Sequence, residues 1–133
     1  MTLSRLLVTF TVASIVITAV ACTGKAVNED TRIGAEEFKQ KVKESPGVVI
    51  DVRTEEEHIK GHLAITDYNS NLLNGDFEAH LDSLDKNKTY YLYCRTGNRS
   101  GQAAELMKKK GFEEVYNVGG YGDLMGSGFK TAD

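Results

Sequence analysis

Apolar residues recur along the chain in two alternating patterns, one typical of helices and one typical of buried strands. Ala35, Phe38 and Val42 lie at helical spacing, and the Ser-Pro-Gly sequence at 45–47 ends that helix. The next run, VVIDV at 48–52, is apolar, β-branched and bounded by turn residues, so it predicts a strand buried on both faces. The folded part of the chain is therefore expected to begin with a helix followed by a central strand.

The same alternation continues toward the C-terminus. Thr54, with Glu57 three residues later, has the form of a helix capping box, and Gly61 ends that short helix. The segment 62–76 is expected to contain one short strand around Ile65 and then a loop. The remaining predicted elements are a helix through Phe77, Leu81 and Leu84, a strand TYYLYC at 89–94, a helix from Ser100 with Ala103, Ala104, Leu106 and Met107 on one face and Gly111 at its end, a strand EVYNV at 114–118, and a glycine-rich closing segment.

Strands that alternate with helices predict an α/β fold. We expect a central parallel sheet of about five strands with helices on both faces. A chain of 133 residues suits one domain of this kind, with a core of its own.

The first 21 residues carry a different pattern and are expected to be a targeting segment rather than part of the fold. One charged residue, Arg5, precedes an apolar stretch, and small residues stand just before Cys22. This order predicts a signal peptide at 1–21 of the lipoprotein type, with lipidation of Cys22 and an exported, membrane-anchored location in the periplasm or cell envelope. Ordinary cleavage and an uncleaved anchor are the alternatives. The polar segment 22–30 is then a tether, and 31–133 is the folded domain.

Charge and cysteine content narrow the function classes. The formal net charge is −3, and this mild acidity gives no reason to expect a nucleic-acid partner. The chain has two cysteines, so if Cys22 carries lipid, Cys94 has no partner and no disulfide framework is expected. An unpaired thiol in an oxidising compartment is a liability, which favours a functional role for Cys94.

The sequence CRTGNR begins at Cys94 and directly follows an apolar strand. In a parallel sheet the ligand site lies beyond the carboxyl ends of the strands, which is where this loop is expected. Gly97 and Asn98 are residue types that tolerate positive φ, so the loop can curl until its N–H groups converge near the start of the next helix. Such a loop stabilises a thiolate, with Arg95 and Arg99 available for charge-assisted hydrogen bonds. The alternative is a small buried cysteine with a structural role only.

Two segments together carry a family resemblance. VVIDVRTEEEHIKGH at 48–62 and CRTGNRSGQAAELMKKKGFEEVYNVGG from Cys94 onward resemble the single-domain rhodanese (thiosulfate sulfurtransferase-like) family, over about residues 31–130. The resemblance implies a small rhodanese-like α/β domain whose cysteine cycles between a thiolate and a persulfide. It implies a sulfur donor such as thiosulfate or a persulfide, and a thiol or cyanide acceptor. It implies no metal and no organic cofactor, and it leaves any protein acceptor unidentified.

The resemblance also assigns roles by position. Cys94 matches the catalytic cysteine, and the loop that cradles the persulfide and the donor matches Arg95, Thr96, Gly97, Asn98 and Arg99. The signature of the first half falls on Asp51, Arg53, Glu57 and His62. We interpret these four residues as a charged network that supports the loop from the neighbouring strand. For Asp51 and Arg53 alone, the alternative is a solvated ion pair of small value.

The chain departs from the family pattern in two places. After the Gly-His pair that ends at His62, the sequence LAITDYNSN lacks the usual glycine and is shortened, which is expected to alter a loop near the pocket. Leu124 stands near the position of a common tryptophan in a chain that has no tryptophan. This second departure concerns packing more than chemistry.

Other functions are weighed against sulfur transfer. Cysteine phosphatases and arsenate reductases need five residues between cysteine and arginine, whereas four separate Cys94 from Arg99, which suits a single sulfur atom. A persulfide carrier or binding module without efficient turnover is the other alternative. His58 and His62 have the spacing of a metal pair, but Gly61 interrupts the helix and no third ligand is evident. We therefore predict no metal site and interpret His58 as a packing residue.

Overall fold

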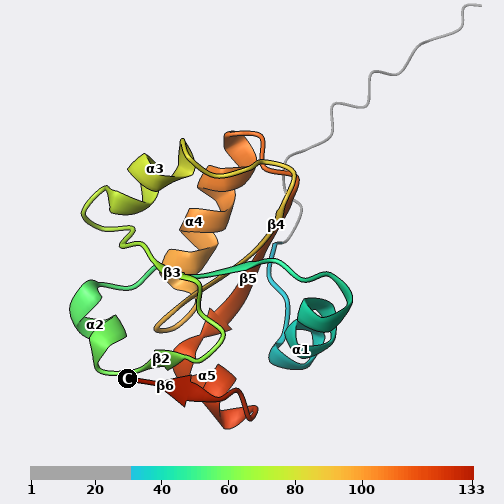
Figure 1. The fold of residues 1–133 in the computed structure, drawn as a ribbon, viewed down its shortest axis with the longest axis vertical. Coiled ribbons are helices and arrows are strands. Elements are labelled where there is room, and N and C mark those ends of the chain that lie inside the picture. Colours follow the sequence, from blue (N-terminus) through green and yellow to red (C-terminus); the bar gives the residue numbers. More distant parts are fainter. Residues whose placement is uncertain (1–30) are drawn as a thin grey trace, which may run out of the picture.

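The computed structural model describes residues 31–133, whose central feature is a four-stranded parallel sheet with helices on both faces (Figure 1). Its strands are ordered β3-β1-β4-β5, and every neighbouring pair is parallel. Their bounds are β1 Val48–Asp51, β3 Tyr68–Asn69, β4 Thr89–Cys94 and β5 Glu114–Gly120. The α/β fold class is confirmed. The sheet has four strands where about five were expected, since Arg32 adds only an isolated parallel bridge to Asn117 at the β5 edge.

The helices cover the two faces of the sheet in pairs. Helices α3 Asp76–Leu81 and α4 Asn98–Lys109 lie on one face, whereas α1 Ala35–Glu44 and α5 Tyr121–Gly126 lie on the other. The short helix α2 Glu55–Ile59 follows β1 at the carboxyl edge of the sheet. A second, antiparallel sheet joins β2 His62–Leu63 to β6 Thr131–Ala132.

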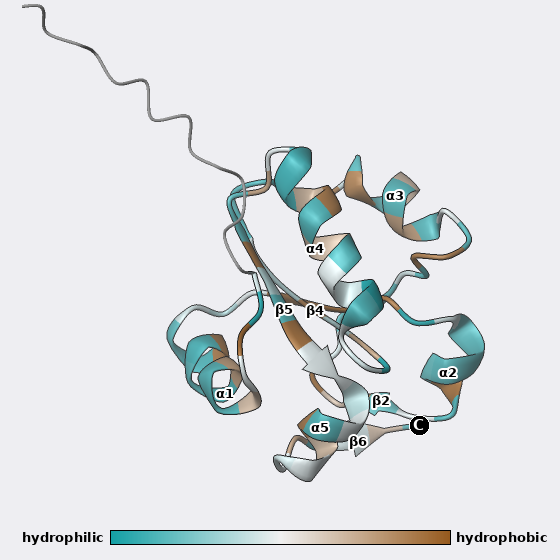
Figure 2. Cartoon of the chain, turned by 180° about the vertical axis from the view of Figure 1, so that it is seen from behind, coloured by the Kyte–Doolittle hydropathy of each residue, from teal (hydrophilic) through white to brown (hydrophobic). Residues whose placement is uncertain are grey.

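Side chains of β4 point alternately to the two faces of the sheet, and this alternation divides the interior into two cores. Tyr90, Leu92 and Cys94 face α3 and α4, whereas Tyr91 and Tyr93 face α1 and α5. All five side chains are buried, as expected for a strand covered on both faces. Hydrophobic segments accordingly run along β4 and β5, while the outer surfaces of α1 and α4 are hydrophilic (Figure 2). Cys94 is thus a core residue that lies under the beginning of α4.

The segment 62–76 differs from its prediction. Ile65 lies in a turn between β2 and β3, so the expected strand around it is wrong. The structure has two strands of two residues each, which are too short to produce a periodic pattern. The contact with β1 at this point is polar, since the Val49 N–H donates to the Asp67 carboxylate at 2.8 Å and the Asp67 N–H donates back to the Val49 carbonyl at 2.8 Å.

The closing segment is more ordered than its glycine content indicates. It forms α5 and β6, and Leu124 is fully buried in the core beside α1. Leu124 is therefore a packing residue, in agreement with the interpretation from the sequence.

Part of the predicted organisation lies outside the described residues. This applies to the signal peptide at 1–21, to lipidation of Cys22 and to the tether at 22–30. Within residues 31–133, none of the helices is both long and apolar enough to cross a membrane.

Candidate active site

Cys94 is the last residue of β4 and lies at the carboxyl edge of the parallel sheet. Its neighbour in the register is Gly120, the last residue of β5. The chain then makes a three-residue connection and enters α4 at Asn98, so the N-terminus of α4 lies directly beyond the strand end. This is the edge at which open α/β sheets bind their ligands.

The Cys94 sulfur is surrounded by hydrogen-bond donors. The Gly97 N–H donates to Sγ at 3.0 Å, and the Ser100 hydroxyl lies 3.4 Å from Sγ. Burial alone raises the pKa of Cys94. The Ser100 hydroxyl and the N–H groups of Ser100, Thr96 and Gly97 outweigh burial, so the net effect is a lowered pKa. The loop therefore favours a thiolate, which is the reactive form of cysteine.

The shape of the loop depends on Gly97. This residue caps α4 with a φ of 93°, a conformation that side chains strongly disfavour. A Cβ at this position would lie 2.2 Å from Nη1 of Arg32, whose guanidinium packs against the loop. Asn98 was also expected to tolerate positive φ, but it is the first residue of α4, and its side chain accepts a hydrogen bond from Gln102 at 2.7 Å. One residue with positive φ is sufficient, because the helix begins immediately after it.

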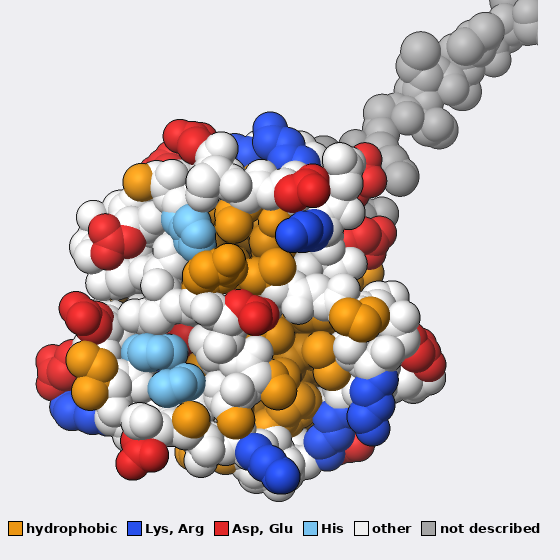
Figure 3. Space-filling view, in the orientation of Figure 1, with side chains coloured by type: hydrophobic (Ala, Val, Ile, Leu, Met, Phe, Trp, Pro, Cys, Tyr) orange, Lys and Arg blue, Asp and Glu red, His pale blue; other side chains and the backbone are white. Residues whose placement is uncertain are grey.

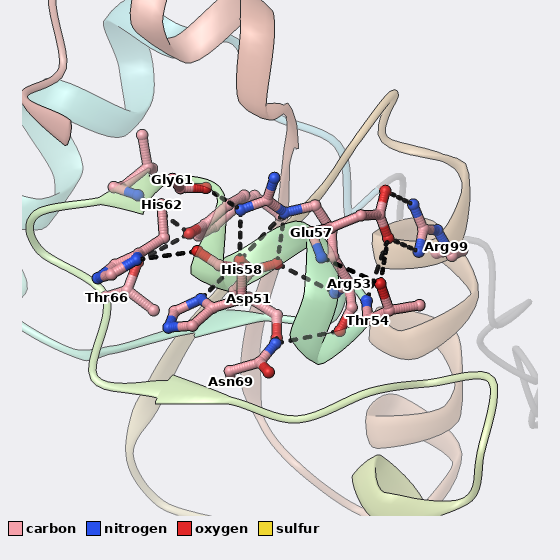
Figure 4. A network of polar contacts seen from close by, with 12 residues as sticks. Asp51, Arg53, Thr54, Glu57, His58, Gly61, His62, Thr66, Asn69 and Arg99 are labelled. Atoms are coloured by element: carbon pink, nitrogen blue, oxygen red, sulfur yellow. Dashed lines mark hydrogen bonds and ion pairs between the residues drawn. The ribbon is translucent and has the colours of Figure 1, made fainter. Parts of the chain in front are cut away.

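Glu57 connects α2, through Arg99, to the loop that follows Cys94. The Glu57 carboxylate accepts two hydrogen bonds from the Arg99 guanidinium, at 2.7 and 2.9 Å (Figure 4). The predicted capping box also forms, since the Thr54 side chain accepts from the Glu57 N–H and the Thr54 N–H donates to the Glu57 carboxylate. The hydrogen bond from Arg99, helped by those from Thr54, lowers the pKa of Glu57 to about 2. Glu57 is thus the predicted support that contacts the loop directly.

Asp51 and Arg53 form a buried pair rather than the solvated pair considered as the alternative. Arg53 donates to the Asp51 carboxylate through Nε and Nη2, and Nη2 also donates to the Gly61 carbonyl at 2.8 Å (Figure 4). Both side chains are buried, and the guanidinium lies over the rings of Tyr121 and Tyr93, at 4.3 and 5.5 Å from their centroids. Neither residue bonds to the loop. The pair instead fixes the passage from β1 through α2 to β2, and so positions Glu57.

The two histidines near α2 belong to the same polar network. His58 packs against His62 and also has a polar partner, since His58 Nδ1 lies 3.0 Å from Asp51 Oδ2. His62 stacks on His58 with ring centroids 3.9 Å apart, and two histidine side chains are visible side by side on the face shown in Figure 3. His62 Nδ1 is 3.2 Å from the His58 carbonyl, so this polar contact of His62 is with α2 and not with the loop after Cys94. Within residues 31–133, no three His, Cys, Asp or Glu side chains are grouped to hold a metal.

Two polar residues of the site were not identified from the sequence, Ser100 and Asn117. The Ser100 hydroxyl lies 2.8 Å from Asn117 Oδ1, and Asn117 Nδ2 donates to the Gly97 carbonyl at 2.9 Å. Asn117 lies on β5, where Val118 is an extra residue in the pairing with β4 and the Gly119 N–H reaches Asn117 Oδ1 at 3.1 Å. The available signal was one asparagine within the apolar run EVYNV, a polar residue in a strand predicted to be buried.

The remaining loop residues surround the mouth of the site. Arg95, Thr96 and Asn98 are exposed, whereas Arg99 is half-buried and held by Glu57. Arg95 is therefore the arginine of the loop whose side chain is open to solvent. The loop as a whole presents backbone donors inside and a cationic side chain outside.

Comparison with known proteins identifies relatives of this arrangement. A family model for the rhodanese-like domain matches residues 34–124. A Bacillus subtilis (strain 168) protein named "Putative sulfur carrier protein YrkF" is 38% identical over 87 residues, which are 65% of this chain and 45% of that protein. Thiosulfate sulfurtransferase PspE of Escherichia coli (strain K12) is 45% identical over 40 residues, covering 30% of this chain and 38% of that protein. A tRNA uridine(34) hydroxylase of Chlamydia felis (strain Fe/C-56) is 29% identical over 119 residues, covering 83% of this chain and 37% of that protein.

The solved structures agree with the fold. The crystal structure of a rhodanese-like domain protein from Staphylococcus aureus superposes with a TM-score of 0.62 at 31% identity, and covers 74% of this chain and 95% of that one. The chain spans less than half the length of the three curated relatives.

Replacing Glu57 with glutamine is expected to lower the free energy of unfolding near neutral pH by about 1 kcal/mol, because it removes the charge from a partly exposed, bidentate pair. The folded-state pKa of about 2 lies below the ordinary value of 4.5, so this contribution is complete above the ordinary value and is lost as pH falls toward 2. Urea unfolding of wild type and Glu57→Gln from about pH 6 to about pH 3 should show the difference shrinking.

Glu55→Gln is the matched control for this series, since Glu55 is exposed on the same helix. It should change the unfolding free energy little at any pH. A Glu57→Gln effect that stays constant over the pH series would contradict the assignment of the stabilisation to the ionised carboxylate.

Proposed function

The chain belongs to the rhodanese-like domain family, and from this premise we propose that it is a sulfurtransferase acting through a persulfide on Cys94. It moves sulfane sulfur from a donor such as thiosulfate to a thiol or cyanide acceptor. The observation that carries the proposal is the convergence of the Gly97 N–H and the Ser100 hydroxyl on Sγ, in a loop at the carboxyl edge of the sheet.

In the first step the Cys94 thiolate attacks the outer sulfur of thiosulfate. A new S–S bond forms on Sγ, the S–S bond of thiosulfate breaks, and sulfite leaves with its electron pair. The outer sulfur of the resulting persulfide carries the negative charge. The N–H groups of the loop and the N-terminus of α4 stabilise that charge, which is the role such groups play toward anions.

In the second step an acceptor thiolate or cyanide attacks the outer sulfur. The bond between the two sulfur atoms breaks and its electron pair returns to Sγ, which regenerates the thiolate. Both steps are nucleophilic displacements at sulfur in which every electron pair stays with the donor, Cys94 or the acceptor, so the cycle needs no external oxidant or reductant. The thiolate that begins the cycle also ends it, and the lowered pKa of Cys94 serves both steps.

A phosphatase-like reaction is less compatible with this loop. Both terminal nitrogens of Arg99 are engaged by Glu57, and four residues rather than five separate Cys94 from Arg99. The relatives named as a sulfur carrier and as a thiosulfate sulfurtransferase support sulfur chemistry at this site. Two forms of this chemistry remain to be distinguished by experiment: catalytic turnover, and storage of a persulfide for a partner.

Incubation of the purified protein with thiosulfate, followed by removal of excess donor, is expected to add about 32 Da to the intact mass, one sulfur atom on an activated thiolate. Cyanide should discharge the added sulfur as thiocyanate and restore the original mass. Cys94→Ser should keep the fold but neither gain the sulfur nor turn over, because a hydroxyl at this position cannot replace the thiolate nucleophile.

An unchanged mass with a thiol that remains titratable would contradict thiosulfate as donor. A persulfide that forms but is discharged no faster than a small-molecule persulfide would favour the carrier over the enzyme. Sulfur transfer that persists in Cys94→Ser would exclude the proposed role of Cys94.

The exposed Arg95 is proposed to bind the anionic donor at the mouth of the loop. Arg95→Gln is expected to raise KM for thiosulfate by roughly tenfold with a smaller effect on kcat, since a charge-assisted hydrogen bond to the donor is lost. Steady-state kinetics with thiosulfate and with an uncharged persulfide precursor separate the effects, and Arg95→Lys should restore part of the affinity. Equal weakening for both donors would count against this role.

We further propose that the domain is exported and held at a membrane by lipid on Cys22, as the pattern of residues 1–22 supports. In the native host, full-length protein should incorporate labelled fatty acid and sediment with membranes. Cys22→Ala should lose the label, and Cys94→Ser should retain it. Absence of label from the wild type, or its persistence in Cys22→Ala, would rule out this anchor.

A further inference from the structure

The Ser100 hydroxyl has one proton and two acceptors within reach. Asn117 Oδ1 lies 2.8 Å from Ser100 Oγ, and Cys94 Sγ lies 3.4 Å from the same oxygen. Ser100 is fully buried, so water does not compete for this proton. Because a hydroxyl donates one hydrogen bond at a time, the state of the sulfur decides which acceptor receives it.

The orientation of the Asn117 amide is fixed by two backbone groups. Nδ2 donates to the Gly97 carbonyl at 2.9 Å, and Oδ1 accepts from the Gly119 N–H at 3.1 Å. A flipped amide would place a donor against the Gly119 N–H and an acceptor against the Gly97 carbonyl. Oδ1 therefore always faces Ser100. The backbone of Asn117 is held as well, since its N–H and carbonyl pair with the Thr31 carbonyl and the Ile33 N–H.

We propose that Asn117 is a positioning residue for sulfur transfer. Its Oδ1 accepts the hydrogen bond of the Ser100 hydroxyl while Cys94 Sγ is uncharged, and the hydroxyl turns to donate to Sγ when a thiolate forms there. This inference rests on the proposed function for its place in the reaction. With an uncharged sulfur, the shorter bond to Asn117 Oδ1 is favoured. With a thiolate, the charge-assisted bond to sulfur is stronger, and the hydroxyl turns.

The exchange leaves no buried polar atom without a partner. When the hydroxyl turns to sulfur, Asn117 Oδ1 keeps the Gly119 N–H, and Nδ2 keeps the Gly97 carbonyl. An acceptor that lost its last donor in a buried site would oppose the exchange with its full desolvation cost. The second donor on Oδ1 removes that cost, so the hydroxyl can follow the charge on sulfur without movement of the loop.

The reaction changes the charge on Sγ twice in each cycle. In the persulfide the negative charge lies on the outer sulfur and Sγ is uncharged, so the hydroxyl bonds to Asn117. When an acceptor attacks the outer sulfur, the S–S bond breaks and its electron pair moves to Sγ, toward which the hydroxyl turns. Ser100 therefore stabilises the departing thiolate more than the persulfide, and only an interaction of that kind lowers the barrier to discharge.

Several charged groups act on the same sulfur and must be kept constant in any test. Arg99 of α4 interacts electrostatically with Cys94, and Glu57 of α2 neutralises part of the positive charge of Arg99. Arg32 packs on Gly97 from the chain segment beside β5, and Arg95 lies in the loop. All four remain unchanged in the variants below.

The first test follows the side-chain amide signals of Asn117 by NMR in full-length protein, while thiolate formation is followed by ultraviolet absorbance. In the wild type, the Asn117 signals are expected to titrate with the same midpoint as the thiolate. In Ser100→Ala the thiolate forms at higher pH, and the Asn117 signals no longer follow it. Asn69 is an internal control, since its amide bonds to the Asp51 and Arg53 carbonyls and not to Ser100.

Three results would overturn the inference. The Asn117 signals could fail to titrate in the wild type, could titrate equally in Ser100→Ala, or could titrate in Cys94→Ser. The second result would mean that Asn117 senses only the field of the thiolate, and the third that it reports another group. No sulfur donor is used, so this outcome is independent of whether thiosulfate loads the enzyme.

The second test is a double-mutant cycle on the rate of Cys94 alkylation by iodoacetamide, measured below the midpoint of thiolate formation. Ser100→Ala is expected to slow alkylation roughly tenfold, because one hydrogen bond to the thiolate is lost. Asn117→Ala removes the competing acceptor but also loosens the loop at Gly97. The alkylation rate of Asn117→Ala is divided by that of the wild type, and the rate of the double variant by that of Ser100→Ala. The first ratio should be at least about threefold higher than the second.

Equal ratios in the two backgrounds would show that Asn117 acts only by holding the loop, and would refute the exchange. If Asn117→Ala does not fold, the NMR titration of wild type and Ser100→Ala decides the question, since it needs no substitution at Asn117.

Discussion

The short connection between β4 and α4 is the constraint on which the rest of the site depends. A strand buried on both faces must hand over to a helix that packs back on the sheet after three residues. The turn is possible because Gly97 adopts a φ of 93°, and the absence of a Cβ at Gly97 leaves room for the Arg32 guanidinium. The same turn directs the N–H groups of Thr96, Gly97 and Ser100 toward Cys94. Fold and chemistry therefore meet at one glycine.

Two ion pairs, one buried and one more exposed, lie near this connection. The Asp51–Arg53 pair is buried, and such pairs are weak evidence for stability, since desolvation offsets much of their attraction. Its geometric effect is clearer: it joins the end of β1 to the Gly61 carbonyl beyond α2. The Glu57–Arg99 pair is more exposed and reaches across to α4. One pair holds α2 to the sheet, and the other holds the loop to α2.

Local patterns were sufficient for the central part of this arrangement. The apolar run before Cys94, the capping box at Thr54 and the Gly-containing loop are all short-range signals, and each formed as predicted except that Asn98 begins α4 instead of adopting positive φ. The contacts of Ser100 and Asn117 join residues 17 and 20 positions apart, from a helix and a strand, so no periodicity contains them. The contact of His58 was not predicted for a related reason, since its partner Asp51 lies on a different element. Strands of two residues, as in β2 and β3, leave no detectable alternation.

The donors that hold the sulfur belong largely to the backbone. N–H groups are present whatever side chain a residue carries, and the positions around the mouth, Arg95, Thr96 and Asn98, point their side chains to solvent. In evolutionary terms, thiolate stabilisation and the chemistry of the exposed mouth are thus separable traits. Under the proposed function, substitutions at the three exposed positions change which donor or acceptor is bound, while Gly97, Ser100 and Asn117 hold the thiolate.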